Sequence, residues 1–277
     1  MTIDEIIAEA LKEDLGSGDH SSLSTIPKTE RGRAQLFAKE DGIIAGIDVA
    51  RKVFIAVDSH IIFKNFVSDG DKIKVGDVIF EVEGSSVSLL SAERLALNFM
   101  QRMSGIATKT HRMVSLLEGL NTKLLDTRKT TPLLRELEKY SVKVGGGENH
   151  RFGLYDMIMI KDNHIDFAGG IEKAIEASND YLMKEDLDLK IEIEVKDMDE
   201  VEEVLRVGNI HRIMFDNFTP ELMKEAVKRI GGRFETEASG GITETTLRAY
   251  AETGVDYISV GALTHHIKSL DLSLRAV

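Results

Sequence analysis

Residues 190–216 have the sequence KIEIEVKDMDEVEEVLRVGNIHRIMFD. Two β-rich runs, Lys190–Val195 and Arg212–Asp216, flank the segment Met198–Val207, in which apolar residues recur at helical spacing. A strand, a helix and a second strand in this order form a parallel βαβ unit with a right-handed crossover. The stretch therefore predicts an α/β fold built on a parallel sheet.

The same pattern recurs on both sides of this stretch. Glu194, Asp216, Ala238 and Gly261 follow one another at intervals of 22, 22 and 23 residues, each in or at the end of a β-rich run. Six or seven such units favour an incomplete, TIM-like α/β barrel over an open doubly wound sheet, which has the same element order. The β-rich runs are Lys123–Asp126, Met157–Lys161, Lys190–Val195, Arg212–Asp216, Arg233–Ala238 and Tyr257–Gly261, separated by helical patterns at Leu133–Tyr140, Phe167–Ser178, Met198–Val207, Pro220–Ile230 and Thr243–Thr253.

The residues before the barrel mix strands and helices. Short β-rich runs enclose a helix around Val49–Val57, and Val67–Phe80 has the turn residues of a hairpin meander. A long helical segment follows at Leu89–Leu120, in which Gly105 is the expected break. The polar cluster Asp19–Ser22, which follows the first helix, is interpreted as a loop rather than a metal or catalytic site.

These patterns divide the chain into two predicted domains. Residues 1–108 form an N-terminal α+β domain and residues 109–266 the barrel, with residues 267–277 packing back on the first domain. Val67–Val82 also resembles the repeat of lipoyl and biotinyl carrier domains, but no lysine stands where those domains carry the modified lysine. A carrier module is therefore the binding-module alternative.

The composition excludes several classes of protein. With 277 residues, 42% hydrophobic and 30% charged, the chain is typical of globular proteins. The absence of cysteine excludes a disulfide, a thiolate metal site and a cysteine nucleophile. No apolar run approaches the roughly 20 residues of a membrane span, and Met1–Leu15 has acidic residues among its apolar ones, unlike a signal peptide. We expect a cytoplasmic protein that binds no membrane.

Cationic side chains are concentrated in one part of an acidic chain. The net charge is −12, whereas residues 121–164 carry eight Lys and Arg against six Asp and Glu. A basic island of this size suits a small polyanion, because nucleic acid would require a broad basic face. A glycine run within it would let the backbone approach the bound anion. The island contains Thr127-Arg128-Lys129-Thr130-Thr131-Pro132, Gly145-Gly146-Gly147, His150-Arg151 and Lys161-Asp162-Asn163-His164.

Two glycine-bearing loops follow the last two predicted strands. They are Ser239-Gly240-Gly241 and Val260-Gly261-Ala262. In α/β barrels the active site lies at the C-terminal ends of the strands, and loops at this place commonly bind a phosphate through backbone N–H groups and a helix N-terminus. We therefore predict that both loops hold a phosphate group.

Glu194 and Asp216 end neighbouring strands in the same barrel. Two carboxylates that face phosphates predict Mg²⁺, although either residue could instead cap a helix or pair with a lysine. Neither a Walker A loop nor a dinucleotide-binding glycine motif is present, which disfavours nucleoside triphosphates and NAD. The residues thus indicate a barrel enzyme with a phosphorylated, multiply charged substrate. An aldolase with Lys161 as Schiff-base lysine, or a decarboxylase, fits the same pattern.

Together these motifs resemble one known family, the quinolinate phosphoribosyltransferases, also called nicotinate-nucleotide pyrophosphorylases (carboxylating). The similarity runs in order along nearly the whole chain, and Thr127–Pro132 combined with Lys161–His164 is highly specific. One departure is His266, where serine is expected. The other matching motifs are Glu93-Arg94, Leu97–Phe99, Ser104–Thr108, His150-Arg151, Glu192–Val195, Asp216–Phe218, Glu237–Ile242 and Val260–His265.

The resemblance implies transfer of phosphoribose from phosphoribosyl pyrophosphate to quinolinate, with Mg²⁺ as cofactor. The products would be nicotinate mononucleotide, pyrophosphate and CO₂, a step of de novo NAD biosynthesis. The nearest alternative is the paralogous pyrophosphorylase-like protein found with molybdenum transport. That protein would share the phosphate loops and differ in the acceptor.

The resemblance also implies roles for single residues, with Lys129, Lys161, Glu194 and Asp216 as the catalytic ones. The quinolinate carboxylates would be held by Arg128, His150, Arg151 and Lys161, with Thr127 as a further substrate-binding residue and Lys129 towards the pyrophosphate. The ribose hydroxyls and Mg²⁺ would meet Glu194 and Asp216, and the 5′-phosphate would be held by Ser239, Gly240, Gly241, Val260, Gly261 and Ala262.

Arg94 is a separate case. Its sequence context is that of an ordinary surface charge. The resemblance implies instead that Arg94 enters the active site of a second subunit. The expected assembly is therefore a homodimer with shared active sites. The sequence leaves open whether these dimers associate into larger oligomers.

Overall fold

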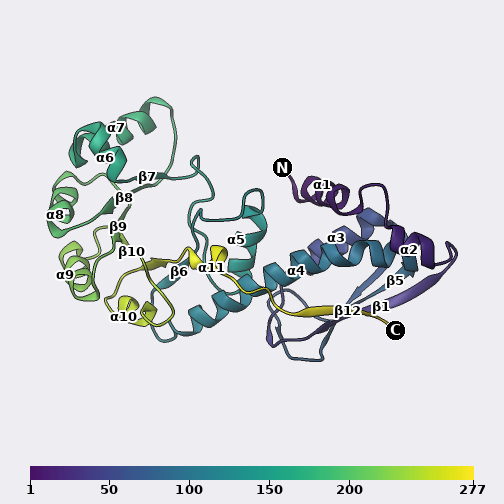
Figure 1. The fold of residues 1–277 in the computed structure, drawn as a ribbon. Coiled ribbons are helices and arrows are strands. Elements are labelled where there is room, and N and C mark those ends of the chain that lie inside the picture. The colour runs from purple at the N-terminus through teal and green to yellow at the C-terminus, as the bar shows by residue number, and fades with distance from the viewer. The chain divides into compact units, whose positions relative to one another are not determined.

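The structure, a computed structural model, describes all residues from Met1 to Val277. The chain forms two compact units, each built from segments that are distant in sequence (Figure 1). Unit 1 consists of Met1–His111, Thr130–Gly146 and Leu263–Val277, and unit 2 consists of Arg112–Lys129 and Gly147–Ala262.

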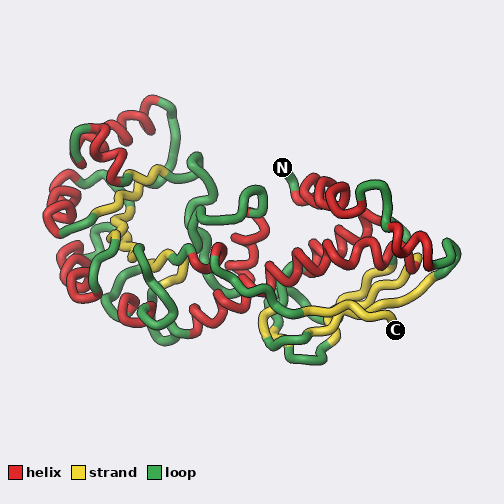
Figure 2. The backbone as a smooth tube through the Cα atoms, in the orientation of Figure 1, coloured by secondary structure: helices red, strands yellow, loops and turns green.

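Unit 1 has an α+β fold. Its main sheet is antiparallel with strand order β12-β1-β5-β3, and Ala276 of the C-terminal strand lies opposite Ala34. Figure 2 shows helices on one face of this sheet. The strands are β1 (Arg31–Ala38), β3 (Ile62–Asn65), β5 (Val78–Ser85) and β12 (Leu272–Ala276), β2 (Gly42–Ile43) pairs with β4 (Lys72–Ile73), and the helices are α1 (Ile3–Leu15), α2 (His20–Thr25), α3 (Ile47–Val57), α4 (Ser86–Ser115), α5 (Arg135–Val144) and α11 (Ala262–His265).

The core of unit 1 forms because its strands and helices each bury one apolar face. Leu36 and Ala38 alternate with less buried residues along β1 and belong to the same buried cluster as Val53 of α3. Phe54 of α3 and Phe80 of β5 meet edge to face, with ring centroids 5.9 Å apart. This cluster packs the helices onto the sheet.

Asp19 begins a short helix rather than a loop. Its carboxylate accepts hydrogen bonds from the backbone N–H of Ser22 at 3.1 Å and from the Ser22 hydroxyl at 2.5 Å. The bond from the Ser22 hydroxyl, followed by the bond from the Ser22 backbone N–H, holds the pKa of Asp19 below its ordinary value, because both bonds favour the ionised carboxylate. The sequence-based interpretation of Asp19–Ser22 as a loop was wrong because the N-cap allows one further helical turn.

Loss of this N-cap gives a small, testable effect. Asp19→Ala should lower the free energy of unfolding by about 1 kcal/mol at neutral pH, measured by urea denaturation. Because the folded-state pKa is depressed, the stabilisation is complete above the ordinary value of 3.8 and is lost as the pH falls through the folded-state pKa. A difference between the two proteins that does not shrink in acid would contradict this role.

Helix α4 is continuous through Gly105, where a break was predicted. A Cβ atom at this position would lie only 2.3 Å from the carbonyl oxygen of Lys268. The glycine therefore allows the segment that leads to β12 to pass close to the helix. The prediction of a break was wrong because close backbone packing, not helix termination, explains this glycine.

A partly buried ion pair links residues 130–146 to helix α4 within unit 1. Arg102 on α4 contacts Glu138 on α5, with Nε at 2.9 Å from Oε1, and its Nη2 donates to the Thr131 hydroxyl at 2.7 Å. The predicted barrel domain, residues 109–266, included this segment and residues 263–266, which the structure groups with unit 1.

Unit 2 is the predicted α/β barrel, with six parallel strands in the order β6-β11-β10-β9-β8-β7. The end strands β6 and β7 share no ladder, so the barrel is incomplete, and the predicted fold class is confirmed. Figure 1 shows the helices outside the strands. The elements are β6 (Lys123–Leu125), β7 (Ile158–Ile160), α6 (Asp162–Ala168), α7 (Ile171–Lys184), β8 (Ile191–Val195), α8 (Met198–Val207), β9 (Arg212–Asp216), α9 (Pro220–Ile230), β10 (Glu235–Ser239), α10 (Leu247–Ala251) and β11 (Tyr257–Ser259).

The strands of unit 2 have an apolar outer face and a charged inner face. In β8, isoleucine and valine alternate with Glu192 and Glu194, so the two carboxylates point to the opposite side from the apolar residues. Glu192 lies in register with Arg212 of β9. Helices such as α8, with Val204 fully buried, cover the apolar face. Charged side chains consequently meet inside the barrel.

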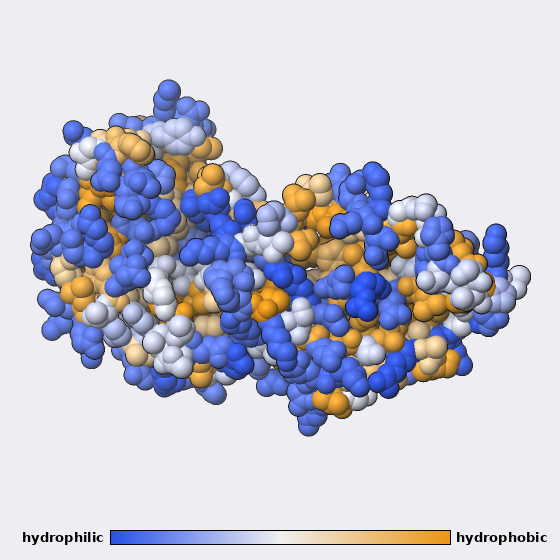
Figure 3. All heavy atoms as spheres, viewed as in Figure 1, coloured by the Kyte–Doolittle hydropathy of each residue, from blue (hydrophilic) through white to orange (hydrophobic).

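The face of the molecule drawn in Figure 3 is mainly polar. Figure 3 shows hydrophilic side chains over most of the visible face, with apolar patches between them. None of the helices combines the length and the apolar composition of a bilayer-spanning helix.

Candidate active site

A cavity of about 340 Å³ opens in unit 2 around the C-terminal ends of the strands. Lys161 follows β7 directly, Ser239 ends β10 and Ser259 ends β11, so the strand ends deliver these side chains to one place. The location is the one that α/β barrels use for catalysis. The lining residues are Thr127, Arg128, Lys129, His150, Arg151, Met159, Lys161, Met214, Ser239 and Ser259.

Cations dominate the lining of this pocket. Arg128, Lys129, Arg151 and Lys161 all contribute to it. Burial and the neighbouring charge of Arg128 lower the pKa of the Arg151 guanidinium. Like charges brought together in a partly buried cavity create a positive potential, so an anion with more than one negative charge fits this pocket.

Apolar side chains form another part of the lining. Met159 of β7 and Met214 of β9 lie on the inner face of the barrel. Thioether side chains adapt to flat apolar and aromatic surfaces. Met159 is almost fully buried, with 9% of its surface exposed, and Met214 has 4% exposed. The pocket therefore suits a ligand that is both anionic and flat.

The two carboxylates predicted to hold a metal differ in their contacts. Glu194 forms an ion pair with the Nζ of Lys161. Asp216, at the end of β9, lies in register with Ser239, and its side chain makes neither an ion pair nor a hydrogen bond. Pairing with a lysine, the structural alternative considered for these residues, thus occurs at Glu194 and not at Asp216.

The loop after β10 requires its glycines. Gly240 has a φ of +98°, and a Cβ atom there would lie 2.2 Å from the side-chain oxygen of Asn217. Gly241 also has a positive φ, of +61°. Two successive residues of this kind turn the chain sharply after Ser239, which itself lines the pocket. In the loop after β11, the N–H of Val260 is bonded to the carbonyl of Leu125.

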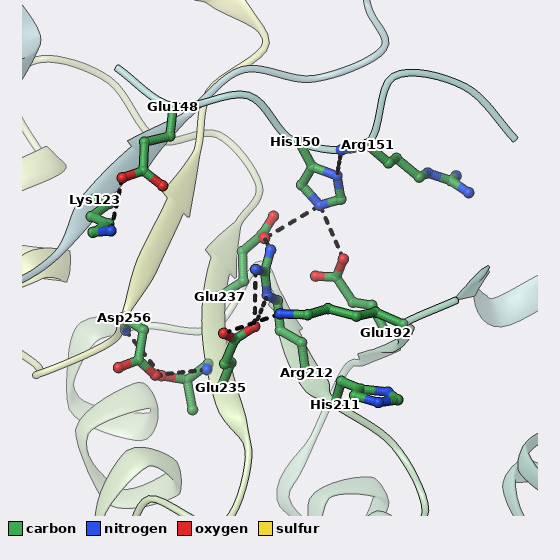
Figure 4. A network of polar contacts seen from close by, with 12 residues as sticks. Lys123, Glu148, His150, Arg151, Glu192, His211, Arg212, Glu235, Glu237 and Asp256 are labelled. Carbon is green, nitrogen blue, oxygen red and sulfur yellow. Dashed lines mark hydrogen bonds and ion pairs between the residues drawn. The ribbon is translucent and has the colours of Figure 1, made fainter. Parts of the chain in front are cut away.

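A buried charge network lies beneath the pocket (Figure 4). The Nε2 atom of His150 is 3.0 Å from a carboxylate oxygen of Glu192 and 3.3 Å from one of Glu237. Glu237 also accepts a 2.8 Å hydrogen bond from Nη1 of Arg212, whose Nη2 reaches Glu235 at 3.1 Å. The network therefore connects three neighbouring strands of the barrel.

His150, Glu192 and Glu237 influence one another's protonation. Burial acts to lower the pKa of His150, but Glu192 and Glu237 outweigh it and raise the pKa to about 9. Burial, followed by the charge of Glu237, raises the pKa of Glu192 to about 7. A second proton on the ring is opposed by the hydrogen bond that Nδ1 accepts from the Arg151 amide at 2.7 Å. The geometry favours a ring protonated at Nε2, with one proton shared by the carboxylates.

The structure brings together most of the residues that the sequence singled out. Seven line the pocket, Glu194 contacts one of them, and Asp216 ends the strand beside Ser239. The loops that follow β10 and β11 contain Gly240, Gly241, Val260, Gly261 and Ala262. Arg94 belongs to unit 1, is exposed, and makes no ion pair or hydrogen bond through its side chain.

None of the three glycines of the run Gly145-Gly146-Gly147 is among the residues that line the pocket, where the sequence analysis expected them to approach the anion. A Cβ atom at Gly145 would lie 2.5 Å from the carbonyl oxygen of Ala107, so this glycine serves the packing against α4. Three functional candidates were missed: Glu192, Glu237 and Arg212. Their signal is the alternation of charged and apolar residues within fully buried strands, since a charge is rarely buried without a partner.

The chain matches two family descriptions. Residues 19–104 match "Quinolinate phosphoribosyl transferase, N-terminal domain", and residues 106–275 match "Quinolinate phosphoribosyl transferase, C-terminal domain". Together the two matches include every residue of the pocket.

Relatives and solved structures are similar over nearly the whole chain. Quinolinate phosphoribosyltransferase (decarboxylating) 2, mitochondrial, of Nicotiana glauca is 45% identical over 98% of this chain and 81% of its own length. The probable nicotinate-nucleotide pyrophosphorylase (carboxylating) of Bacillus subtilis is 44% identical over 95% of this chain and 89% of its own. NadC from Streptococcus pyogenes is 42% identical, with a TM-score of 0.94 and coverage of 99% and 97% of the two chains.

Proposed function

Because the chain belongs to the quinolinate phosphoribosyl transferase family, we propose that it transfers phosphoribose from phosphoribosyl pyrophosphate to quinolinate. The products are nicotinate mononucleotide, pyrophosphate and CO₂, and the enzyme is a pentosyltransferase of NAD biosynthesis. The observation that carries the proposal is the pocket at the strand ends, in which four cations share the lining with methionine and hydroxyl side chains and with His150.

Quinolinate fits this pocket by charge and by shape. It is a flat pyridine ring with two adjacent carboxylates. Arg128, Arg151 and Lys161 supply positive charge, and a guanidinium can bind a carboxylate through two parallel hydrogen bonds. Met159 and Met214 offer an apolar surface to the ring. The phosphoribosyl group would follow towards Lys129 and the loops after β10 and β11, where backbone N–H groups can hold the 5′-phosphate.

The chemistry needs orientation and fixed charge more than a general base. The pyridine nitrogen uses its lone pair to bond to ribose C1, and the C1–oxygen bond breaks with its electrons leaving on pyrophosphate. The alkylated ring nitrogen is then cationic. It stabilises the electron pair left on C2 when the neighbouring carboxylate departs as CO₂, and C2 finally takes up a proton. Cations placed around the carboxylates and pyrophosphate favour both steps.

We propose that Glu194 and Asp216 hold Mg²⁺. Mg²⁺ is usually bound by one or two carboxylates together with substrate oxygens, and Asp216 has no protein partner that would compete. When bound, Mg²⁺ neutralises charge on the departing pyrophosphate. Lys161 would then exchange its contact with Glu194 for a substrate carboxylate. An aldolase role for Lys161 is less suitable, because the carboxylate of Glu194 already engages the Nζ that would have to attack a carbonyl substrate.

We propose that two copies of the chain form the functional enzyme. The exposed side chain of Arg94 lacks a partner within its own chain. Strand β7, an edge of the sheet, is near exposed apolar residues: Leu154, Tyr155, Phe167, Tyr181 and Met183 are between 51% and 92% exposed. An apolar patch beside an unpaired edge is typical of a protein interface. A second copy would cover this patch and supply its Arg94 to the pocket.

The cytoplasm remains our prediction for the compartment. The names of several plant relatives place those proteins in mitochondria or chloroplasts, whereas the relative from Bacillus subtilis has no such designation in its name.

The acceptor decides between this function and that of the molybdenum-associated paralogue. Purified protein with phosphoribosyl pyrophosphate and Mg²⁺ should release pyrophosphate and CO₂ when quinolinate is added. Nicotinate, which lacks the second carboxylate, should be used at least about 10²-fold less well, because cations would be left unpaired in the pocket. Comparable turnover with nicotinate, or none with quinolinate, would exclude the proposed acceptor.

A further inference from the structure

Three carboxylates with no access to solvent hold the short segment Asn149–Arg151 in place. Asp126 accepts the backbone N–H of His150 at 2.9 Å and the side-chain amide of Asn149 at 2.5 Å. Glu192 and Glu237 face Nε2 of the His150 ring (Figure 4). Asp126, Glu192 and Glu237 are all fully buried. Three buried carboxylates next to a ligand pocket are costly to desolvate, so we expect them to have a role beyond packing.

We propose that Glu192 and Glu237 are positioning residues for substrate recognition, which fix the His150 ring and through it the backbone of Arg151. The inference rests on the proposed function, since it takes quinolinate as the ligand of Arg151. His150 connects the two buried carboxylates to the backbone of Arg151, because each of its ring nitrogens faces one of these groups. Nε2 lies between the two carboxylates, and Nδ1 accepts the N–H of Arg151 at 2.7 Å.

The position of Arg151 matters because its guanidinium must meet a carboxylate at hydrogen-bond distance. One end of the side chain is held by the bond from Nη1 to the carbonyl of Met157 at 3.2 Å. The other end is the backbone, which the His150 ring fixes. A displacement of about 1 Å in such a group can cost about 10²-fold in rate. If the His150 ring were free to move, Arg151 would therefore be displaced and its contact with the ligand would weaken.

The energetics of the network argue against a purely structural role. Apolar residues of similar volume are often as stable as a buried ion pair, or more so, because two charges lose their hydration. Here Arg212 balances Glu237 at 2.8 Å and stacks on the ring of Tyr257, with its guanidinium carbon 4.0 Å from the ring centroid. The charge of Arg212 and the Nε2–H group of His150 thereby occupy the space between the carboxylates.

The test compares three glutamates that differ in their contact with His150. Glu192→Gln and Glu237→Gln keep the side-chain shape and remove the charge that faces the ring. Glu235→Gln is the matched control, because Glu235 stands on the same strand as Glu237 and also pairs with Arg212, but does not contact His150. The first two variants should raise KM for quinolinate at least tenfold and leave KM for phosphoribosyl pyrophosphate within twofold. The control should leave both within twofold.

A double-substitution cycle identifies the route of the effect. In an Arg151→Ala background, in which turnover is lost, Glu237→Gln should raise the Kd for quinolinate, measured by titration calorimetry, by less than twofold further, because the residue that it positions is gone. Glu192→Asp preserves the charge balance and shortens the side chain, so it serves as a second variant if the amides do not fold. It should give the same selective rise in KM.

The outcomes separate the proposals from each other. Absence of quinolinate turnover in the wild-type protein would reject the proposed function itself. An active wild type whose variants raise both KM values equally, or whose effects add fully to that of Arg151→Ala, would overturn the positioning role. So would a stoichiometric divalent cation in the purified protein that Glu192→Gln removes.

Discussion

Arg94→Ala and Arg151→Ala should each abolish activity alone, and a mixture of the two proteins should regain roughly a quarter of wild-type sites after subunit exchange. The reason is geometric. If Arg94 enters the neighbouring subunit's pocket, a mixed dimer has one pocket with both lesions and one with neither. Random exchange makes half of the dimers mixed, which gives the expected fraction. Turnover before and after exchange, with exchange monitored by native mass spectrometry, is the measurement.

Two controls sharpen this experiment. Arg94→Lys should remain strongly impaired, because an ammonium cannot reproduce the bidentate geometry of a guanidinium. Arg94 is exposed, so its replacement should leave the fold and the dimer intact. Proven mixed dimers without recovered activity would mean that Arg94 acts within its own chain, and the proposal of shared sites would then fail.

Replacement of the strand-end carboxylates should have the second large effect. Asp216→Asn combined with Glu194→Gln should lower Mg²⁺-dependent turnover by about 10²-fold or more, because no fixed charge would hold the cation against the pyrophosphate. Titration calorimetry should show weaker binding of phosphoribosyl pyrophosphate in Mg²⁺ and largely unchanged binding of quinolinate.

The single variants help to interpret the double one. Glu194 is paired with Lys161, so Glu194→Gln also changes a residue expected to bind quinolinate. Asp216 has no such partner, and Asp216→Asn is the cleaner test of the metal. Glu235→Gln, whose carboxylate is at the N-terminal start of β10, controls for loss of charge. Unchanged metal dependence in the double variant would assign both residues a structural role.

The sequence predicts the barrel well because apolar residues recur at a different spacing in its strands than in its helices. Met198–Val207 and Pro220–Ile230 form helices with the predicted bounds, and the repeat of about 22 residues correctly indicates successive βα units. The cationic pocket follows from the barrel, since strand ends converge on one side. Here the local pattern and the tertiary structure agree.

Features that depend on contacts between distant segments were not predictable. Gly105 suggests a helix break until Lys268 is known to pass beside it. Residues 130–146 belong to unit 1 because Arg102 and Glu138 pair, and no local pattern encodes that pair. Glu192 lies in a recognisable motif, but its partner His150 comes from a loop, and the other members of the network, Arg212 and Glu237, come from separate strands.

The charged interior of the barrel also restricts how this protein can evolve. Removing one member of a buried ion pair typically costs about 3–5 kcal/mol, a large part of the roughly 5–15 kcal/mol that separates folded from unfolded chains. His150, Glu192, Arg212 and Glu237 are therefore not free to drift one at a time, whereas the apolar residues on the outer face of the same strands can exchange for others of similar volume. Descendants of this sequence should keep the four together or replace them together.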